Sequence, residues 1–304
     1  MTSIELVPDS ERTGLIGALP TSARPYASLM RVDRPIGTWL LYWPCAWGML
    51  LAGVDGRWSL LAWFLLGAFA TRSAGCVYND LVDRDLDKQV ARTRLRPLAS
   101  GRVSTRGAWV LIAILCAVGL LVLTQLPLVA VLTSLASVAL VAIYPFMKRI
   151  TWWPQAWLGL VFSWGALVGW AGITGGLEAP AWWLWVGSVF WVVGYDTLYA
   201  IQDKEDDALV GVRSSARRLG PNAAFGVAIF YLLALSGWGV AIWLVRPEPL
   251  ALLALLPAAI HLGQQVLRAD PDDGDKALAL FRSNRFTGLL LALGFAAVGL
   301  SSAA

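Results

Sequence analysis

The stretch WSLLAWFLLGAFATRSAGCVY, residues 58–78, contains a single charged side chain, that of Arg72. An apolar run of about 20 residues is long enough to cross the hydrocarbon core of a bilayer as a helix. The sequence is 58% hydrophobic and 14% charged over 304 residues, far more apolar than a soluble domain. Together these features predict an all-α, polytopic membrane helical bundle of about nine transmembrane helices. The other candidate spans are 36–54, 108–124, 127–146, 155–173, 182–201, 223–245, 249–266 and 286–302.

Short turns join several of these spans, as expected of antiparallel neighbours in one bundle. We therefore expect a single membrane-embedded domain over residues 1–304. Residues 1–25 include Glu5, Asp9 and Glu11 and lack the apolar core of a signal peptide. This segment is predicted to be a cytoplasmic tail.

Basic residues are distributed very unevenly among the predicted loops. With the amino terminus in the cytoplasm, the loops on the opposite side hold only Arg57 and Arg246 of the 24 Lys and Arg residues. Lys and Arg accumulate in the cytoplasmic loops of membrane proteins. The pattern predicts an integral protein of the bacterial inner membrane or an equivalent membrane, with the longest charged loop on the cytoplasmic side.

That charged loop begins with NDLVDRDLDKQVARTRLRPLASG, residues 79–101. Asn79, Asp83 and Asp87 are spaced four apart, so a continuing helix would place them on one face. One interpretation is a solvated helix end whose acids pair with neighbouring Arg and Lys. The other is a divalent-cation site, because Mg²⁺ is usually held by one or two carboxylates together with substrate phosphates.

A second acidic cluster, YDTLYAIQDKEDD at residues 195–207, favours the metal-site interpretation. Asp196, Tyr199, Asp203 and Asp207 recur at intervals of three or four, and Asp196 lies within a predicted span, where an ionisable group is a default functional candidate. Both clusters end even-numbered helices and therefore lie on the same predicted side. We expect them to bind Mg²⁺ and a diphosphate.

Basic side chains accompany both clusters, as an anionic ligand requires. Arg72 lies two helical turns before Asn79, on the same face and deeper in the membrane. The loop after the fourth span either anchors the helix at the interface or binds an anion. The loop after the first motif either folds over a bound anion or forms a static basic surface. The loop after the fourth span contains Lys148 and Arg149. The loop after the first motif contains Arg92, Arg94 and Arg96.

These parts suggest electrophilic transfer of a lipid. An allylic diphosphate needs a divalent cation and basic side chains to neutralise the departing diphosphate. Its apolar chain needs a slot open to the bilayer, and water must be kept from the developing carbocation. A helical membrane bundle can provide all three conditions.

The motifs carry a family resemblance. RSAGCVYNDLVDRDLDKQVARTRLRPLASG, YPFMKRITWWPQ and YDTLYAIQDKEDD, together with LMRVDRPIGTWLLYWP near the start, resemble the UbiA superfamily of membrane prenyltransferases. Within that superfamily they are most similar to the 4-hydroxybenzoate polyprenyltransferases of ubiquinone biosynthesis. The resemblance implies Mg²⁺-dependent transfer of a polyprenyl group to the ring carbon ortho to the hydroxyl of 4-hydroxybenzoate.

By position, the resemblance also implies roles for individual residues. The metal ligands would be Asn79, Asp83, Asp87, Asp203 and Asp207, and the four aspartates among them would also be the catalytic residues. The substrate-binding set would be Arg31, Arg72, Asn79, Arg92, Arg96, Lys148, Arg149, Asp196 and Tyr199. Lys148 and Arg149 would bind either the diphosphate or the benzoate carboxylate, and Arg72 is another candidate for the carboxylate.

Two alternatives remain at this stage. A related prenyltransferase would use haem, homogentisate, a naphthoate or a glycerol lipid as acceptor. A cation-coupled transporter would also contain intramembrane charges, but its charges would line a pathway near the midplane. The expected partners are polyprenyl diphosphate, 4-hydroxybenzoate and the lipid bilayer, with no nucleic acid. Donor chain length, protein partners and oligomeric state are left open.

Overall fold

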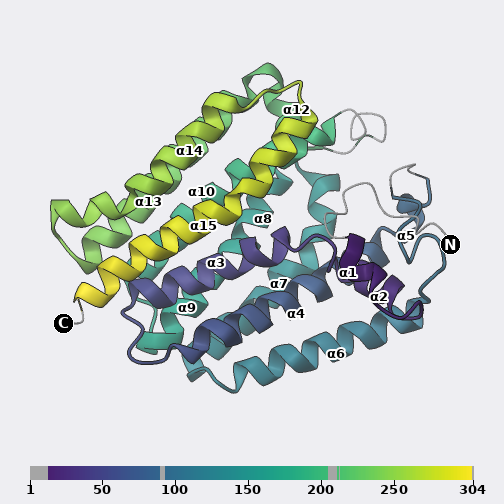
Figure 1. Cartoon of the computed structure of the whole chain (residues 1–304), viewed down its shortest axis with the longest axis horizontal. Helices are drawn as coiled ribbons and strands as arrows, with labels where there is room; N and C mark the ends of the chain where they lie inside the picture. Colours follow the sequence, from purple (N-terminus) through teal and green to yellow (C-terminus); the bar gives the residue numbers. More distant parts are fainter. Residues whose placement is uncertain (1–12, 90–92, 205–210, 212, 303–304) are drawn as a thin grey trace. The chain divides into compact units, whose positions relative to one another are not determined.

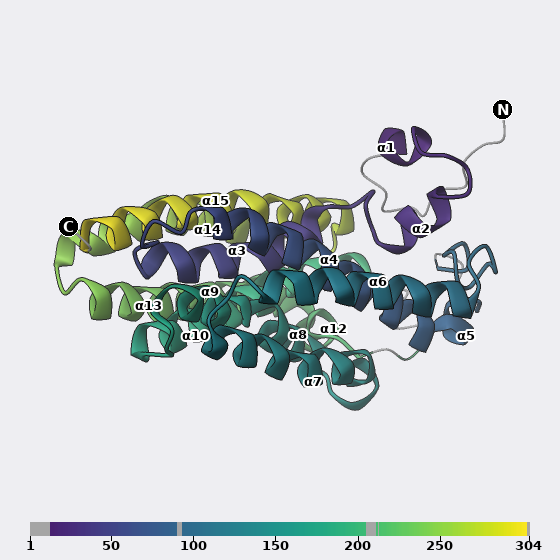
Figure 2. The ribbon, with the colours of Figure 1, turned by 90° about the horizontal axis from the view of Figure 1, so that it is seen from below.

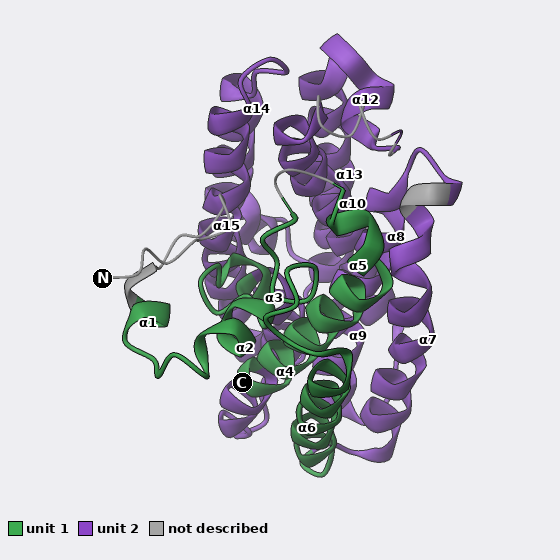
Figure 3. Ribbon diagram, turned by 90° about the vertical axis from the view of Figure 1, so that its right-hand side faces the viewer, with its two compact units in different colours: residues 1–39, 65–125 green, residues 40–64, 126–304 purple. Residues whose placement is uncertain are grey.

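The computed structural model describes residues 13–89, 93–204, 211 and 213–302. These residues form helices joined by turns, and none of them belongs to a strand (Figure 1). The chain divides into two compact units, residues 1–39 with 65–125 and residues 40–64 with 126–304 (Figure 3). The predicted all-α architecture is confirmed.

The first unit holds the first acidic motif and the helices around it. Its core consists of Leu29, Val77, Leu98, Val103 and Ala108, all buried. Ser104 caps the last helix of the unit, because its hydroxyl accepts a hydrogen bond from the Gly107 N–H at 3.1 Å. The helices are α1 (Thr13–Gly17), α2 (Arg24–Leu29), the start of α3 (Ile36–Leu51), most of α4 (Ser59–Val82), α5 (Arg84–Asp87) and α6 (Thr105–Leu123).

The second unit is built around α10 (Ala179–Gln202), which packs against α8, α9, α13 and α15. α14 packs against both α13 and α15 (Figure 2). Besides the rest of α3 and the start of α4, the other helices are α7 (Leu128–Ile150), α8 (Pro154–Ser163), α9 (Gly165–Thr174), α12 (Ser215–Leu219), η1 (Gly220–Asn222), α13 (Ala223–Val245), η2 (Pro249–Leu255), α14 (Leu256–Arg268) and α15 (Gly274–Ser302).

Two glycines bring α10 and α13 into backbone contact. A Cβ atom added to Gly237 would lie 2.8 Å from the Cα atom of Gly187 and 3.2 Å from the carbonyl oxygen of Trp183. Helices in lipid associate through close packing of small residues, since lipid tails are as apolar as the side chains. The pair Gly187 and Gly237 therefore sets the separation of these two helices.

Aromatic side chains fill the centre of the second unit. Trp47 has no exposed surface, and its ring centroid lies 4.9 Å from that of Trp191 and 5.5 Å from that of Trp238. The Trp47 indole N–H donates to the carbonyl oxygen of Gly288 at 2.9 Å. Buried indoles need such partners for their polar ends. This contact ties α3 to α15.

A buried polar network joins four helices of the same unit. The Trp191 indole on α10 donates to Asn284 Oδ1 on α15 at 2.8 Å. The Tyr231 hydroxyl on α13 donates to Gln265 Oε1 on α14 at 2.6 Å, and the Asn284 amide donates to the same oxygen at 3.3 Å. His261 on α14 hydrogen-bonds the Thr287 hydroxyl at 2.8 Å. Each buried polar group in this network thus has a partner, as an apolar environment demands.

The predicted spans agree closely with the helices. Among the described residues, eight helices are long and apolar enough to cross a bilayer. α3 is the remaining predicted span, and its 16 residues make it shorter than a straight crossing of about 20 residues. The helix predicted at 286–302 begins earlier, at Gly274, and the one predicted at 155–173 is interrupted at Trp164.

Candidate functional site

The first acidic motif follows the end of α4. α4 ends at Val82, and Asp83 takes up a non-helical conformation with φ −93° and ψ 2° before α5 begins. The spacing of four is nevertheless kept, because the Asp83 N–H donates to Asn79 O at 2.9 Å and the Asp87 N–H donates to Asp83 O at 2.8 Å. The two carboxylates are buried, with exposed fractions of 1% for Asp83 and 6% for Asp87.

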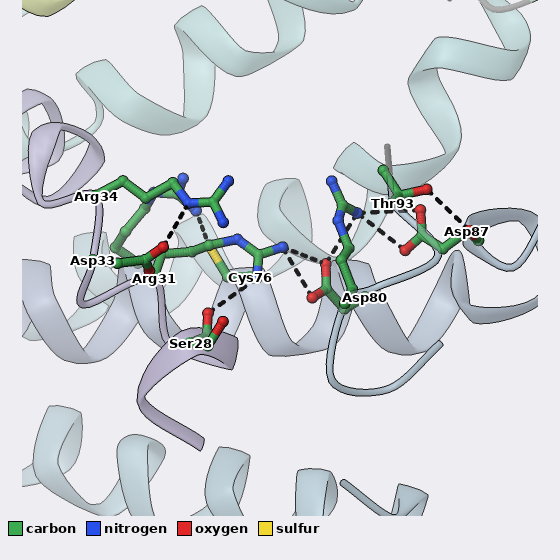
Figure 4. A network of polar contacts seen from close by, with 10 residues as sticks. Ser28, Arg31, Asp33, Arg34, Cys76, Asp80, Asp87 and Thr93 are labelled. Carbon is green, nitrogen blue, oxygen red and sulfur yellow. Dashed lines mark hydrogen bonds and ion pairs between the residues drawn. The ribbon is translucent and has the colours of Figure 1, made fainter. Parts of the chain in front are cut away.

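Asp80 is a buried carboxylate that the sequence interpretation did not select. It is fully buried, and its two oxygens accept hydrogen bonds from Arg31 Nη2 at 2.7 and 2.9 Å. Arg96 Nη1 donates to Asp80 Oδ1 at 3.2 Å. Figure 4 shows Asp80 between Arg31 and Asp87. The signal available in the sequence was its spacing from Asp83 and Asp87, three and seven residues, which places all three acids on one helix face; the four-residue spacing counted from Asn79 passed over it.

Arg96 bridges two carboxylates. Besides Asp80, its Nη1 atom donates to Asp87 Oδ1 and Oδ2 at 3.2 and 3.0 Å. The loop that carries Arg96 is held by the Thr93 hydroxyl, which donates to the carbonyl oxygen of Asp87 at 3.1 Å. Leu98, from the same loop, is buried in the core of the unit. Arg96 is therefore fixed at the motif, whereas Arg94 is exposed.

Burial and neighbouring charges tune the carboxylates differently. The pKa of Asp87 is raised, first by burial and also by the charge of Asp80, while Arg96 opposes the shift. The pKa of Asp85 is lowered by its hydrogen bond to Lys88 and by Arg84. The Asp85 side chain is 74% exposed, so this acid belongs to the solvated surface.

Arg31 is held in an unusual conformation. Its φ angle of 61° lies in the left-handed region, which non-glycine residues adopt at a cost of about 1 kcal/mol or more. Burial by itself lowers the pKa of the Arg31 guanidinium. The charge of Asp80 and the hydrogen bonds to Asp80 more than offset burial, so the pKa of Arg31 is raised overall. Surrounding contacts therefore fix both the backbone and the charge of Arg31.

Arg72 lies half-buried on α4, within the first unit. Its guanidinium contacts the sulfur atom of Cys76 and lies so close to Gly37 on α3 that a Cβ atom there would collide with it. A glycine at position 37 thus leaves room for this arginine.

The second motif lies at the end of α10. Asp196 and Tyr199 are partly buried there, and the Tyr199 ring packs on Phe281 with centroids 4.8 Å apart. Asp203 is the residue after the last turn of α10. Asp207 lies outside the described residues.

Three predicted basic residues cannot be placed. Arg92 lies outside the described residues, and the side chains of Lys148 and Arg149, near the end of α7, are also outside the description. Close to that end, Arg213 and Arg217 lie over the Trp152 ring, with their guanidinium carbons 5.7 and 5.5 Å from its centroid. Sequence reasoning did not predict this contact, because a cation–π pair between distant segments leaves no periodic signal.

The structure brings together four charged residues of the first unit: Arg31, Asp80, Asp87 and Arg96. The second motif belongs to the other unit, so the convergence of the two motifs stays a prediction. Within the described part of the chain, no three His, Cys, Asp or Glu side chains gather closely enough to hold a metal ion. Two buried carboxylates and an amide nevertheless suit Mg²⁺, which commonly takes its other ligands from water and phosphate.

Comparison with known proteins decides the family. The profile of the UbiA prenyltransferase family matches residues 41–300. The chain belongs to the UbiA prenyltransferase family. The resemblance carried by the motifs is thereby confirmed, and with it the interpretation of the sequence as an integral membrane protein.

Curated UbiA relatives match this chain over most of its length. A protein of Caenorhabditis elegans named "4-hydroxybenzoate polyprenyltransferase, mitochondrial" is 43% identical over 97% of this chain and 83% of its own length. A Drosophila melanogaster protein with the same name is 44% identical over 91% of this chain and 71% of its own length.

Solved UbiA structures share the fold. An apo UbiA homolog from Aeropyrum pernix K1 superposes with a TM-score of 0.68 at 25% identity, over 84% of this chain and 96% of its own. A UbiA homolog from Archaeoglobus fulgidus, bound to GPP and Mg²⁺, has a TM-score of 0.65 at 18% identity, over 91% of this chain and 99% of its own. At that identity the likeness is one of fold.

Proposed function

We propose that this chain transfers a polyprenyl group from a polyprenyl diphosphate to the ring carbon ortho to the hydroxyl of 4-hydroxybenzoate, releasing diphosphate. The observation that carries the proposal is the likeness to relatives named for this acceptor, which extends over 97% of the chain in the C. elegans protein. The reaction is a step of ubiquinone biosynthesis.

The buried acids support the diphosphate half of this proposal. Asn79, Asp83 and Asp87 of the first motif and Asp203 and Asp207 of the second would be the ligands of Mg²⁺. A bound Mg²⁺ would neutralise the charge that develops on the departing diphosphate. The burial of Asp83 and Asp87 supports this role, because a carboxylate attracts a cation more strongly away from bulk water.

Basic residues would bind the anionic groups of the two substrates. Arg31, Arg92 and Arg96 would contact the diphosphate, and Asp196 and Tyr199 would be further substrate-binding residues. The carboxylate of 4-hydroxybenzoate needs a cation of its own, and Arg72, Lys148 and Arg149 are the candidates. Replacing the responsible residue should raise the KM for 4-hydroxybenzoate more than the KM for the donor. If no one of the three replacements did so, this assignment would be wrong.

The location follows from the charge pattern. Lys and Arg are concentrated in the predicted loops on one side of the membrane. This asymmetry supports an orientation in which both acidic motifs face the cytoplasm or an equivalent compartment. The membrane would be a bacterial inner membrane or its mitochondrial counterpart, since the named relatives are mitochondrial. A cysteine-labelling map of the exposed loops in intact cells would test this orientation.

A transfer assay tests the activity. Purified protein in detergent would receive geranyl diphosphate, 4-hydroxybenzoate and Mg²⁺, and the parent would be compared with Asp83→Ala and Asp203→Ala. Asp85→Ala is the matched control, because Asp85 is an exposed acid between Asp83 and Asp87. We expect product from the parent and the control only.

The outcomes separate the alternatives. Product with another aromatic acceptor, but none with 4-hydroxybenzoate, would keep the chemistry and change the substrate. An absence of product with every acceptor in a panel of haem, homogentisate, naphthoate and glycerol lipids would refute prenyl transfer.

A further inference from the structure

Asp80 holds two arginines at the edge of the first motif. It is fully buried on α4, and the same carboxylate accepts from Arg31 at 2.7 and 2.9 Å and from Arg96 at 3.2 Å. Leaving a buried charge without a partner is strongly unfavourable. Asp80 and the two guanidinium groups are therefore interdependent.

Asp80 and Asp87 share a single nitrogen atom. Arg96 Nη1 lies 3.2 Å from Asp80 Oδ1 and 3.0 Å from Asp87 Oδ2. The Nη1 atom carries two N–H groups but faces three carboxylate oxygens, Asp80 Oδ1 and both oxygens of Asp87, so its bonding to one acid weakens its bonding to the other. Without the charge of Asp80, Arg96 would turn fully to Asp87, because the backbone around Arg96 is fixed by Thr93 and by the buried Leu98.

Both consequences for a divalent cation have the same sign. Tighter pairing of Arg96 with Asp87 would occupy the oxygens that the proposed Mg²⁺ site needs. Loss of the Asp80 charge would also make the local potential less negative. Each effect lowers the affinity of the motif for a divalent cation.

We propose that Asp80 is a positioning residue: it takes a share of the Arg96 guanidinium and so keeps Asp87 available to a divalent cation. This role rests on the proposed function of Asp87 as a cation ligand. Asp80 also forms an ion pair with Arg31, the residue with the left-handed backbone conformation.

A double-mutant cycle tests the role without turnover. Binding of Mn²⁺ alone to the full chain in detergent would be followed by electron paramagnetic resonance in the parent, Asp80→Asn, Arg96→Gln and the double variant. We expect Asp80→Asn to raise the Kd about tenfold in the parent background and less than about threefold when Arg96 is already replaced. An equal factor in both backgrounds would overturn the proposal, since Asp80 would then act by charge alone or through the fold. A parent that binds no Mn²⁺ would overturn it as well.

Two further variants control for the loss of a nearby negative charge and for misfolding of Asp80→Asn. Asp85→Asn removes an exposed acid of the same segment and should leave the Kd unchanged. If Asp80→Asn fails to give a monodisperse protein, Asp80→Asn with Arg31→Gln removes the buried pair together, and the same rise in Kd is expected. A Kd equal to that of the parent in this variant would overturn the proposal.

Failure of the proposed function would show itself separately. The parent is also assayed for prenyl transfer with geranyl diphosphate and 4-hydroxybenzoate. A complete binding cycle without product would refute the activity alone, whereas product without coupling in the cycle would refute the role of Asp80 alone.

Discussion

Replacing Gly237 by alanine should separate helix packing from helix propensity, because α13 carries its own control two residues later. A Cβ atom at Gly237 would lie 2.8 Å from backbone atoms of Gly187, whereas one at Gly239 meets nothing closer than 3.9 Å. The atoms facing Gly237 belong to the backbone of α10 and cannot rotate aside. Both variants therefore add one methyl group to α13, but only the methyl group at position 237 meets the backbone of another helix.

The magnitudes follow from these distances. Alanine is about 1 kcal/mol more favourable than glycine within a helix, and this gain applies to both positions. At Gly237 the contact must widen from 2.8 Å into the ordinary range of 3.4–4 Å, which forces α10 and α13 apart. Overpacking of this kind costs about 1–3 kcal/mol. Gly237→Ala should therefore be less stable than Gly239→Ala by about 2 kcal/mol, or about 4–8 °C in the thermal midpoint.

The assay is the loss of monodisperse protein after heating in detergent, with all samples heated at one rate and at one protein concentration. The free energies refer to equilibrium, so only the difference between the two variants is used. A midpoint for Gly237→Ala equal to or above that of Gly239→Ala would refute the conclusion that Gly187 and Gly237 set the spacing of α10 and α13.

Three other expectations concern buried polar groups and the cation. Asn284→Leu leaves the Trp191 indole without its acceptor, at a cost of about 1–3 kcal/mol. We expect the thermal midpoint to fall by about 2 °C or more. A midpoint within about 1 °C of the parent would contradict this. His261→Phe should retain prenyl transfer, since His261 bonds only the Thr287 hydroxyl in the described network, and a loss of about tenfold or more in kcat would instead indicate a chemical role. Chelation with EDTA should abolish product formation, and an excess of Mg²⁺ should restore it; activity that survives chelation would exclude a divalent cation from the reaction.

The helices were predictable because hydrophobic length is a local property of the chain. α13 begins and ends at the predicted residues 223 and 245, and α10 extends only a few residues beyond its predicted start at 182. α15 was predicted too short, since its first turns carry Lys276, Arg282 and Arg285, whose charge ends an apolar run without ending a helix. Helix length in such a segment depends on backbone hydrogen bonding and on tertiary contacts, which hydropathy does not report.

The candidate site was predictable only where periodicity reveals it. The spacing of four between Asn79, Asp83 and Asp87 persists in the structure through two backbone hydrogen bonds. Asp80 was missed because its partners, Arg31 and Arg96, come from segments 49 and 16 residues away. A sequence pattern identifies residues on one face of a helix, but a charge pair across such distances is fixed only by folding.

The bond between Trp191 and Asn284 also has a consequence for biosynthesis. The donor lies on α10 and the acceptor on α15, 93 residues later in the chain. During synthesis α10 enters the membrane before α15 has been made. Until then the Trp191 indole N–H has no Asn284 acceptor, in an environment where water is scarce. The Tyr231 hydroxyl, whose partner Gln265 lies 34 residues later, waits a shorter time. The last helix to be synthesised thus completes the assembly of helices made long before it, and chains that end before Asn284 should be recognised as unfinished by membrane quality-control proteases.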